Sequence, residues 1–229
     1  MKKNAALFWS GGKDSAFALY LVQKHYPEIR VACLVTTLSE EYKRISMHGI
    51  REYLLDKQAE ETGLPLYKMY VPAGSSNQLY EKELNKMLLR LKAEGIEFVI
   101  FGDIFLEDLK QYREDLLKQK GLSAIFPLWK RDTRQYLADF LASGFKTIIC
   151  CTSNLYLDDS WLGRELNERF LLDLPEGIDP CGENGEFHTF CFDGPVFKKP
   201  VNFKTGNKEY RQLSLDRDKK AGFWYLDLY

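Results

Sequence analysis

The sequence predicts an α/β fold in which a parallel sheet is covered by helices on both faces, followed by a smaller mixed α/β lobe. Over most of the chain, short segments that are apolar on both faces alternate with segments of helical periodicity, as is typical of buried parallel strands. A glycine-rich turn joins the first strand to the first helix. After residue 175 Gly, Pro and Asn become frequent and strand-like segments follow one another, which predicts the second lobe.

Apolar runs and helix-end signals place each element of the parallel part. Strands are predicted at residues 5–9, 31–37, 66–71 and 96–101. Apolar residues at helical spacing predict the intervening helices at 14–26, 50–61, 78–94 and 106–119. Pro27, Gly63 and Gly95 follow three of these helices and mark where they end.

The C-terminal part is predicted to contain helices at 133–143 and 159–169 and a strand at 145–151. Strand-like segments follow at 187–192, 196–203 and 210–215, and they indicate an antiparallel element. Residues 121–129 interrupt the regular alternation. We therefore divide the chain into a first domain, 1–120, and a second domain, 121–229.

Composition excludes several classes of protein. The chain has 229 residues, of which 45% are hydrophobic and 28% charged, so it is an ordinary globular protein. Its net charge of −1 argues against a non-specific nucleic-acid binder. Because no apolar run approaches the length of a membrane span and the N-terminal run is too short for a signal peptide, we expect a cytoplasmic protein without membrane contact. Five cysteines without a C-x-x-C pair argue against a disulfide scaffold, a zinc site or an iron–sulfur cluster.

The string S-G-G-K-D-S, residues 10–15, lies between the first predicted strand and helix. Gly11 and Gly12 allow a tight turn and close approach of the backbone to a ligand. The following helix offers unpaired N–H groups and the positive end of its dipole, which suit phosphate. Lys13 adds a positive charge, the hydroxyls of Ser10 and Ser15 add donors, and Asp14 is able to hold Mg²⁺ or cap the helix. This string differs from the Walker A motif and predicts a phosphate-binding loop.

A second cluster of polar residues spans 181–189. Glu183, Glu186 and His188 lie around two glycines, which indicate a turn with its backbone near a ligand. Strand alternation predicts Glu186 and His188 on one face, where a carboxylate would orient the imidazole and raise its basicity. This arrangement suits a site that binds an amine-bearing acceptor or guides ammonia. The neighbouring carboxylates indicate that Cys181 is not a nucleophile, and strand parity makes Cys191 a core residue.

Together these strings resemble a known family. S-G-G-K-D-S resembles the pyrophosphate loop of the N-type ATP pyrophosphatases, also called the PP-loop superfamily. The further strings M-H-G at 47–49, G-D at 102–103, P-L-W at 127–129, W-L-G-R at 161–164 and D-P-C-G-E-N-G-E-F-H-T at 179–189 resemble the diphthine–ammonia ligase family, with the M-H-G form typical of bacterial relatives. The resemblance runs to about residue 199.

The resemblance implies a Rossmann-like sheet of the HUP type (adenine nucleotide alpha hydrolase-like), with ATP at its carboxyl edge. Residues 1–120 would bind ATP and residues 121–229 the acceptor. It also implies an AMP-forming ligase: a carboxylate-bearing acceptor, either a small molecule or a modified protein side chain, attacks ATP, pyrophosphate leaves, and ammonia or an amine displaces AMP. The cofactors implied are ATP and Mg²⁺; a homodimer stays open.

The resemblance and the strand-end positions together assign roles to individual residues. Catalytic roles are predicted for Lys13, Asp103, Glu183, Glu186 and His188. Nucleotide-binding residues are predicted to be Ser10, Gly11, Gly12, Lys13, Asp14, Ser15, Thr36, His48, Gly102 and Arg164. The metal ligands are predicted to be Asp14 and Asp103. Arg113 is the other arginine that suits phosphate, and we favour Arg164 because Gly163 allows close approach.

Two alternative functions remain at this point. Similar phosphate loops occur in enzymes that modify tRNA by thiolation or lysine transfer, although the absent C-x-x-C pairs and the near-neutral charge argue against this function. The chain could instead bind ATP without ligase activity. The basic segment 198–220 is predicted to be a solvated surface.

Overall fold

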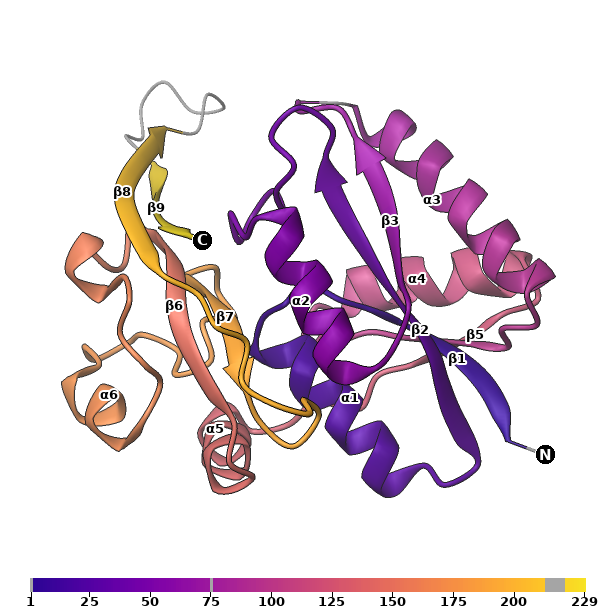
Figure 1. Ribbon diagram of the computed structural model, residues 1–229, viewed down its shortest axis with the longest axis horizontal. Coiled ribbons are helices and arrows are strands. Elements are labelled where there is room, and N and C mark those ends of the chain that lie inside the picture. The colour runs from indigo at the N-terminus through magenta and orange to yellow at the C-terminus, as the bar shows by residue number, and fades with distance from the viewer. Residues whose placement is uncertain (1, 75, 213–220) are drawn as a thin grey trace.

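A computed structural model describes residues 2–74, 76–212 and 221–229 (Figure 1). Five parallel strands form the first sheet in the order β3-β2-β1-β4-β5. Their bounds are β1 Lys3–Phe8, β2 Ile29–Ser39, β3 Leu66–Val71, β4 Phe98–Ile100 and β5 Ser123–Ile125. The helices between them are α1 Lys13–His25, α2 Glu52–Thr62, α3 Asn77–Ala93 and α4 Glu107–Gln119. The predicted parallel α/β fold is confirmed.

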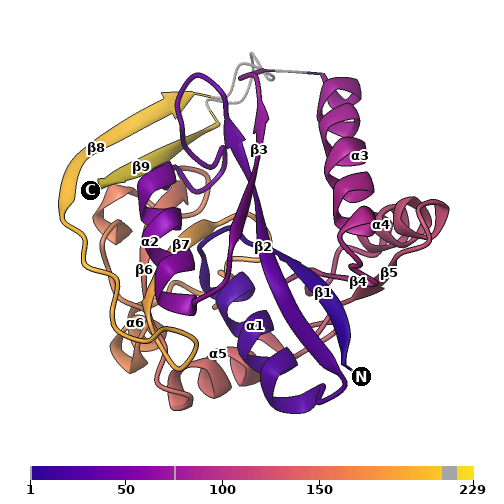
Figure 2. The same cartoon turned by 45° about the vertical axis from the view of Figure 1, so that its right-hand side comes forward.

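Helices cover both faces of this sheet (Figure 2). The apolar residues of α1 and α2 pack in one core cluster and those of α3 and α4 in the other. Neighbouring residues of β1 divide between these clusters, since Leu7 packs in the first and Ala6 in the second. Strands buried on both faces require side chains that are apolar throughout, which is why the apolar runs predicted them.

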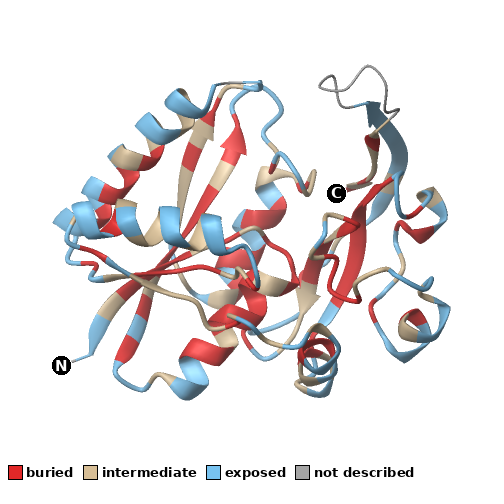
Figure 3. Cartoon of the chain, turned by 180° about the vertical axis from the view of Figure 1, so that it is seen from behind, coloured by how far each residue is buried: buried red, intermediate tan, exposed pale blue. Residues whose placement is uncertain are grey.

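The second sheet is antiparallel and has the order β7-β6-β9-β8. Its strands are β6 Lys146–Ser153, β7 Phe187–Asp193, β8 Thr205–Gln212 and β9 Gly222–Leu228, and the associated helical segments are α5 Thr133–Ala142, the 3₁₀ turn η1 Asp159–Trp161 and α6 Glu168–Asp173. Figure 3 shows buried residues along β6, at the centre of the lobe. The predicted smaller mixed lobe is therefore present.

Two predicted elements in this lobe are wrong. Instead of a helix over 159–169, the chain forms η1 and then α6, and Gly163 adopts a left-handed φ of +82° between them. There the backbone runs beside β6, with Gly163 N donating to Ile149 O and Leu166 N to Thr147 O. Residues 196–203 form no strand, and β9 was not predicted. The predicted strand 210–215 overlaps β8, and its residues 213–215 lie outside the described part.

The two lobes meet along α1 and β7 (Figure 1). β5 pairs with β4, so the first sheet extends past residue 120, and the division at that residue stays a prediction. Among the described residues, no helix combines the length and apolar character that crossing a membrane requires.

Candidate active site

A cavity of about 880 Å³ opens at the carboxyl edge of the first sheet, where β7 and the turn before it face that edge. It brings together residues from segments that are far apart in the sequence. The predicted site residues that line it are Ser10, Lys13, Asp14, Ser15, Thr36, His48, Gly102, Asp103, Glu183 and His188. Gly11, Gly12, Glu186 and Arg164 are not among its lining residues.

Gly11 and Gly12 determine the backbone conformation of the predicted phosphate loop and do not line the cavity. Gly11 has a left-handed φ of +77°, and its carbonyl accepts hydrogen bonds from Cys191 N and from Gln58 Nε2, each 2.9 Å long. A Cβ on Gly12 would lie 2.9 Å from His48 Cε1 and 3.0 Å from Thr189 O, so a side chain there would displace the His48 ring or the Thr189 backbone. Both positions therefore need glycine for reasons of space or backbone conformation.

The N-terminus of α1 faces the cavity as an anion-binding site would. Gly12 is its N-cap and provides no side-chain cap. Lys13 N donates to Thr189 Oγ1 at 3.0 Å, and Ser15 Oγ donates to Gly12 O at 3.0 Å. Helix dipole, hydroxyls and the Lys13 ammonium converge here, which fits the phosphates of ATP.

Lys13 is buried and lies among carboxylates. Its Nζ donates to Asp14 Oδ1 at 2.7 Å and lies 3.6 Å from Glu183 Oε1. Burial lowers the pKa of Lys13, but these two carboxylates outweigh burial and raise the pKa above its usual value. Tyr136 OH donates to the same Asp14 oxygen at 2.8 Å and fixes that carboxylate. Lys13 is therefore held charged at the phosphate end of the cavity.

Glu183 and Glu186 take different roles in the turn. Burial raises the pKa of Glu183 to about 8, although Lys13 opposes this rise. The Glu186 side chain is buried away from the cavity, where it accepts hydrogen bonds from Asp179 N, Asn184 N and Asn184 Nδ2 at 2.8–3.0 Å. Glu186 thus organises the turn that presents Glu183.

The predicted contact between Glu186 and His188 is not formed. Instead, the His188 ring stacks on His48, with centroids 4.7 Å apart. Burial, together with the neighbouring His48 and Lys13, lowers the pKa of His188 well below its usual value, the opposite of the predicted rise. The pKa of His48 is also lowered, chiefly by burial. Both rings are neutral near pH 7, because desolvation outweighs the opposing effects of Asp14 and of the Thr189 carbonyl on His48, and nothing opposes it at His188.

Two buried polar atoms in the cavity wall have no hydrogen-bond partner among the described residues: His188 Nε2 and Thr36 Oγ1. Buried polar groups are nearly always paired, so each of these atoms indicates a polar ligand group. Thr36 lies in β2 and is one of the predicted nucleotide-binding residues. The cavity therefore offers polar contacts at two walls besides the phosphate loop.

Asp103 and Arg113 form an ion pair in the cavity wall. The Arg113 guanidinium also lies over the Phe101 ring, 4.2 Å from its centroid. Burial raises the pKa of Asp103, although Arg113 opposes this rise. A Cβ on Gly102 would lie 3.1 Å from the backbone carbon of Asp14, so this glycine lets β4 approach the phosphate loop.

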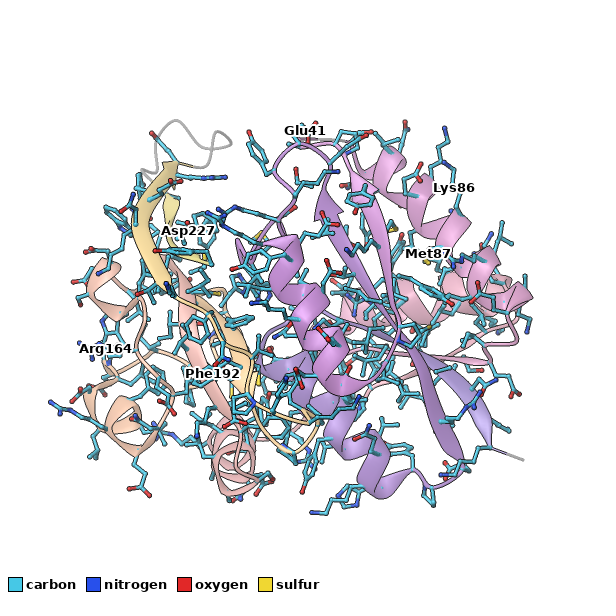
Figure 4. The ribbon with its side chains drawn as sticks, in the orientation of Figure 1. Glu41, Lys86, Met87, Arg164, Phe192 and Asp227 are labelled. Carbon is cyan, nitrogen blue, oxygen red and sulfur yellow. The ribbon has the colours of Figure 1, made fainter. Side chains whose placement is uncertain are left out.

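Arg164 lies at the outer side of the C-terminal lobe (Figure 4). Its guanidinium covers the Trp161 ring at 4.1 Å and contacts Asp173 Oδ2 at 3.4 Å. Of the two arginines, the structure therefore brings Arg113 to the cavity and leaves Arg164 outside. Cys181 lines the cavity, and burial raises its thiol pKa, which keeps it protonated.

The cavity contains two carboxylates that would supply part of the coordination shell of a magnesium ion. Asp14 and Asp103 both line the cavity and supply the oxygen ligands that Mg²⁺ prefers. Within the described ranges, no group of three or more His, Cys, Asp or Glu residues could hold a metal alone. The residues fit an ion that arrives with ATP, because phosphate oxygens and water would complete the shell.

Sequence reasoning missed three residues that build the site: Gln58, Tyr136 and Thr189. Gln58 is fully buried, accepts from Trp9 Nε1 at 2.9 Å and donates to the carbonyls of Gly11 and Cys191. Only an unusual amide on the apolar face of α2 marked it in the sequence. Tyr136 and Thr189 act through contacts to α1 that no local pattern shows.

Comparison with known proteins finds a matching family model for each of the two parts of the chain. Residues 2–124 match the family described as "Diphthamide synthase N-terminal domain", and residues 132–221 match "Diphthamide synthase C-terminal domain". The chain is 31% identical over 213 residues to "Diphthine--ammonia ligase" of Rattus norvegicus and 30% identical over 213 residues to that of Homo sapiens. Both alignments cover 84% of this chain and 79% of the relative. A solved structure, "U34-tRNA thiolase NcsA from Methanococcus maripaludis with its [4Fe-4S] cluster", is 21% identical with a TM-score of 0.39 and covers 61% of this chain and 56% of that one.

Proposed function

The chain belongs to the diphthamide synthase family, and from this premise we infer an ATP-dependent ligase that forms an amide from a carboxylate acceptor and ammonia. ATP is cleaved to AMP and pyrophosphate. One observation carries the proposal: a single cavity holds a charged Lys13 at a helix N-terminus and, on another wall, a neutral His188 with an unpartnered Nε2. The first group suits departing pyrophosphate and the second a proton released during amide formation.

The first step is adenylation. A carboxylate oxygen of the acceptor forms a bond to the α-phosphorus of ATP, and the bond from that phosphorus to the bridging β-phosphate oxygen breaks. The pyrophosphate that leaves carries the growing negative charge. Lys13 and the N–H groups of α1 stabilise this charge, and the hydroxyl of Ser10 adds a donor. Mg²⁺ held by Asp14 and Asp103 would neutralise further phosphate charge.

The acceptor carboxylate would lie toward Arg113. Among the described lining residues, the charged cations are Lys13 and Arg113, and Lys13 belongs to the phosphate end. The Arg113 guanidinium lies over the Phe101 ring, and Ile104 and Leu109 also line the cavity; this apolar surface suits the carbon skeleton of an organic acid better than a polyphosphate. The guanidinium presents a planar fork that matches a carboxylate.

The second step forms the amide. The nitrogen of ammonia bonds to the acyl carbon, the bond from that carbon to the AMP oxygen breaks, and the nitrogen loses a proton. Neutral His188 accepts this proton at Nε2, because its lowered pKa leaves the lone pair free near pH 7. Glu183 lies beside Lys13 in the same cavity, and its raised pKa favours the neutral form, which would not repel the phosphates.

The relatives are named for diphthine, so we propose a diphthine-bearing protein as the first acceptor to test. The purified protein would be incubated with α-labelled ATP, Mg²⁺, isotope-labelled ammonium and the diphthine-bearing translocation elongation factor, prepared from cells that lack their own ligase. We expect labelled AMP and one labelled nitrogen in the acceptor. Release of ADP in place of AMP would refute adenylating ligation. AMP formation with a cell extract but not with this factor would assign another carboxylate acceptor.

A further inference from the structure

The loop that carries His48 is held at its base by the C-terminal strand of the other lobe. We call residues 44–51 the histidine loop. It folds back on itself, with Ile45 N donating to Ile50 O at 3.0 Å and Arg44 bridging to Arg51. Its tip, Ser46, Met47 and His48, lines the cavity of about 880 Å³ described above. The base of the loop lies toward β9 (Figures 1 and 4).

Asp227 of β9 binds both ends of this loop. Its Oδ1 accepts from Arg44 Nη2 at 2.8 Å and from Arg51 Nε at 3.0 Å, and its Oδ2 accepts from Arg51 Nη2 at 2.7 Å. Arg44 also donates to Gly49 O at 2.9 Å through Nη1, so the same arginine ties the loop to itself. The bidentate contact between Arg51 and Asp227 fixes the relative orientation of the two side chains in addition to stabilising the ion pair.

Tyr225, two residues earlier on the same face of β9, supports the loop from the side. A Cβ on Gly49 would lie 2.8 Å from Tyr225 Cδ1, so Gly49 rests directly on this ring. Behind the loop lies a second cavity, of about 210 Å³, lined by Arg44, Ser46, Gly49, Tyr225 and Asp227 among others. Packing therefore does not fill the space behind the loop. Ile45 and Ile50 in the core and the contact of His48 Nδ1 with Thr189 O at 3.1 Å hold other parts of the loop, and the polar contacts of Asp227 fix its base.

We propose that Asp227 is a positioning residue for His48: by clamping Arg44 and Arg51, it sets where the His48 ring meets His188. The two rings come from different lobes, His48 from the histidine loop and His188 from β7. β9 belongs to the same sheet as β7. The contacts of Asp227 with Arg44 and Arg51 therefore fix the position of the histidine loop relative to His188. β9 lies beyond the residues matched by the family comparison, which end at 221. The consequence for catalysis rests on the proposed function; the positioning itself does not.

The test uses the histidine rings as reporters. The chain has three histidines, and His25 is exposed at the end of α1. We would record ring nitrogen and proton NMR signals of the full-length wild type and Asp227→Asn, assigned by substituting each histidine in turn. We expect the His48 and His188 signals to shift in Asp227→Asn and the His25 signal to stay unchanged. His48 and His188 signals identical to those of the wild type would overturn the proposal.

A matched control separates positioning from the loss of any ion pair. Asp193 is 22% exposed and pairs with Lys146 at 3.0 Å within the same lobe, whereas Asp227 is 21% exposed. Asp193→Asn should leave the histidine signals unchanged; equal shifts in both variants would overturn the proposal. If Asp227→Asn does not fold, Arg51→Gln removes part of the clamp from the loop side and should shift the same two signals in a smaller degree.

Kinetics provide the second arm. For amide formation, Asp227→Asn should lower kcat by about tenfold to a hundredfold, as misplacement of a reacting group does, while the KM for ATP changes little. Asp227→Glu should restore part of the loss because it keeps the charge. A rise in the KM for ATP with unchanged kcat would refute the link to proton transfer at His188. If the wild type forms no AMP with any acceptor, the proposed function fails, and the NMR arm still decides the positioning.

Discussion

Replacing Gln58 by leucine should destabilise the protein and loosen the phosphate loop at the same time. The Gln58 side chain is fully buried and joins three segments: Trp9 at the end of β1, Gly11 in the loop and Cys191 in β7. Leucine has similar volume and helix propensity, so the substitution removes the hydrogen bonds and little else.

The magnitude follows from those contacts. The buried Trp9 N–H would lose its partner, which costs about 1–3 kcal/mol, and the two lost bonds to carbonyl oxygens cost about 1 kcal/mol each. Gly11 O keeps its bond from Cys191 N, which limits the cost at that carbonyl. The added apolar contact of leucine offsets about 1 kcal/mol. The net loss is about 3 kcal/mol, which lowers the melting temperature by about 6–12 °C in a chain of this size.

Thermal unfolding followed by circular dichroism measures this loss. Gln111→Leu, at an exposed position of α4, is the matched control and should change the melting temperature by less than about 2 °C. The dissociation constant of ATP should also rise in Gln58→Leu, because Gly11 loses an anchor. If Gln58→Leu melts like Gln111→Leu, the buried amide is not the link between the lobes that we infer.

Three further predictions concern the reaction and its pH dependence. Lys13→Met should lower the rate of AMP formation by about a hundredfold to a thousandfold, the usual cost of removing one preorganised group that stabilises developing charge; a smaller loss in a single-turnover assay would contradict the role at pyrophosphate. His188→Gln should leave exchange of pyrophosphate into ATP, which reports adenylation, near the wild-type rate, while amide formation falls by about a hundredfold or more; equal losses in both assays would exclude a role confined to the second step. Burial raises the pKa of Glu183 from 4.5 to about 8, so the folded state binds a proton more tightly than the unfolded state. This contribution to stability is complete below about pH 4.5 and is lost as pH rises to about 8; Glu183→Gln should flatten this part of the stability curve in denaturant titrations, and an unchanged slope would argue against the raised pKa.

Local patterns predicted the first sheet well because each of its strands is buried on both faces. Such strands must be apolar throughout, and the helices between them show their own periodicity. The second lobe was harder to predict. Residues 159–169 have helical spacing, but hydrogen bonds of Gly163 and Leu166 to β6 hold them in an irregular path. β9 carried a usable signal in its run Gly-Phe-Trp-Tyr-Leu-Asp-Leu, which was not recognised as a strand.

The site shows the same division between local and distant information. The glycine turn at residues 10–12 and the helix α1 that follows it could be predicted because they depend on residues that are neighbours along the chain. Glu186 and Arg164 lie in the right motifs, but their side chains point to the turn backbone and to the outer surface respectively. Arg113 reaches the cavity from the middle of α4, and only its pairing with Asp103 distinguishes it from its charged neighbours.

By itself, the sequence determined the parallel α/β class, the phosphate loop and the polar turn, since each of these depends on residues that are neighbours along the chain. The tertiary structure decided which of the motif residues share one cavity, which carboxyl groups have raised pKa values, and which rings meet. These properties depend on burial and on contacts between segments as distant as Lys13 and Thr189 or Arg51 and Asp227. Desolvation and through-space charge act over distances that the order of residues does not encode locally.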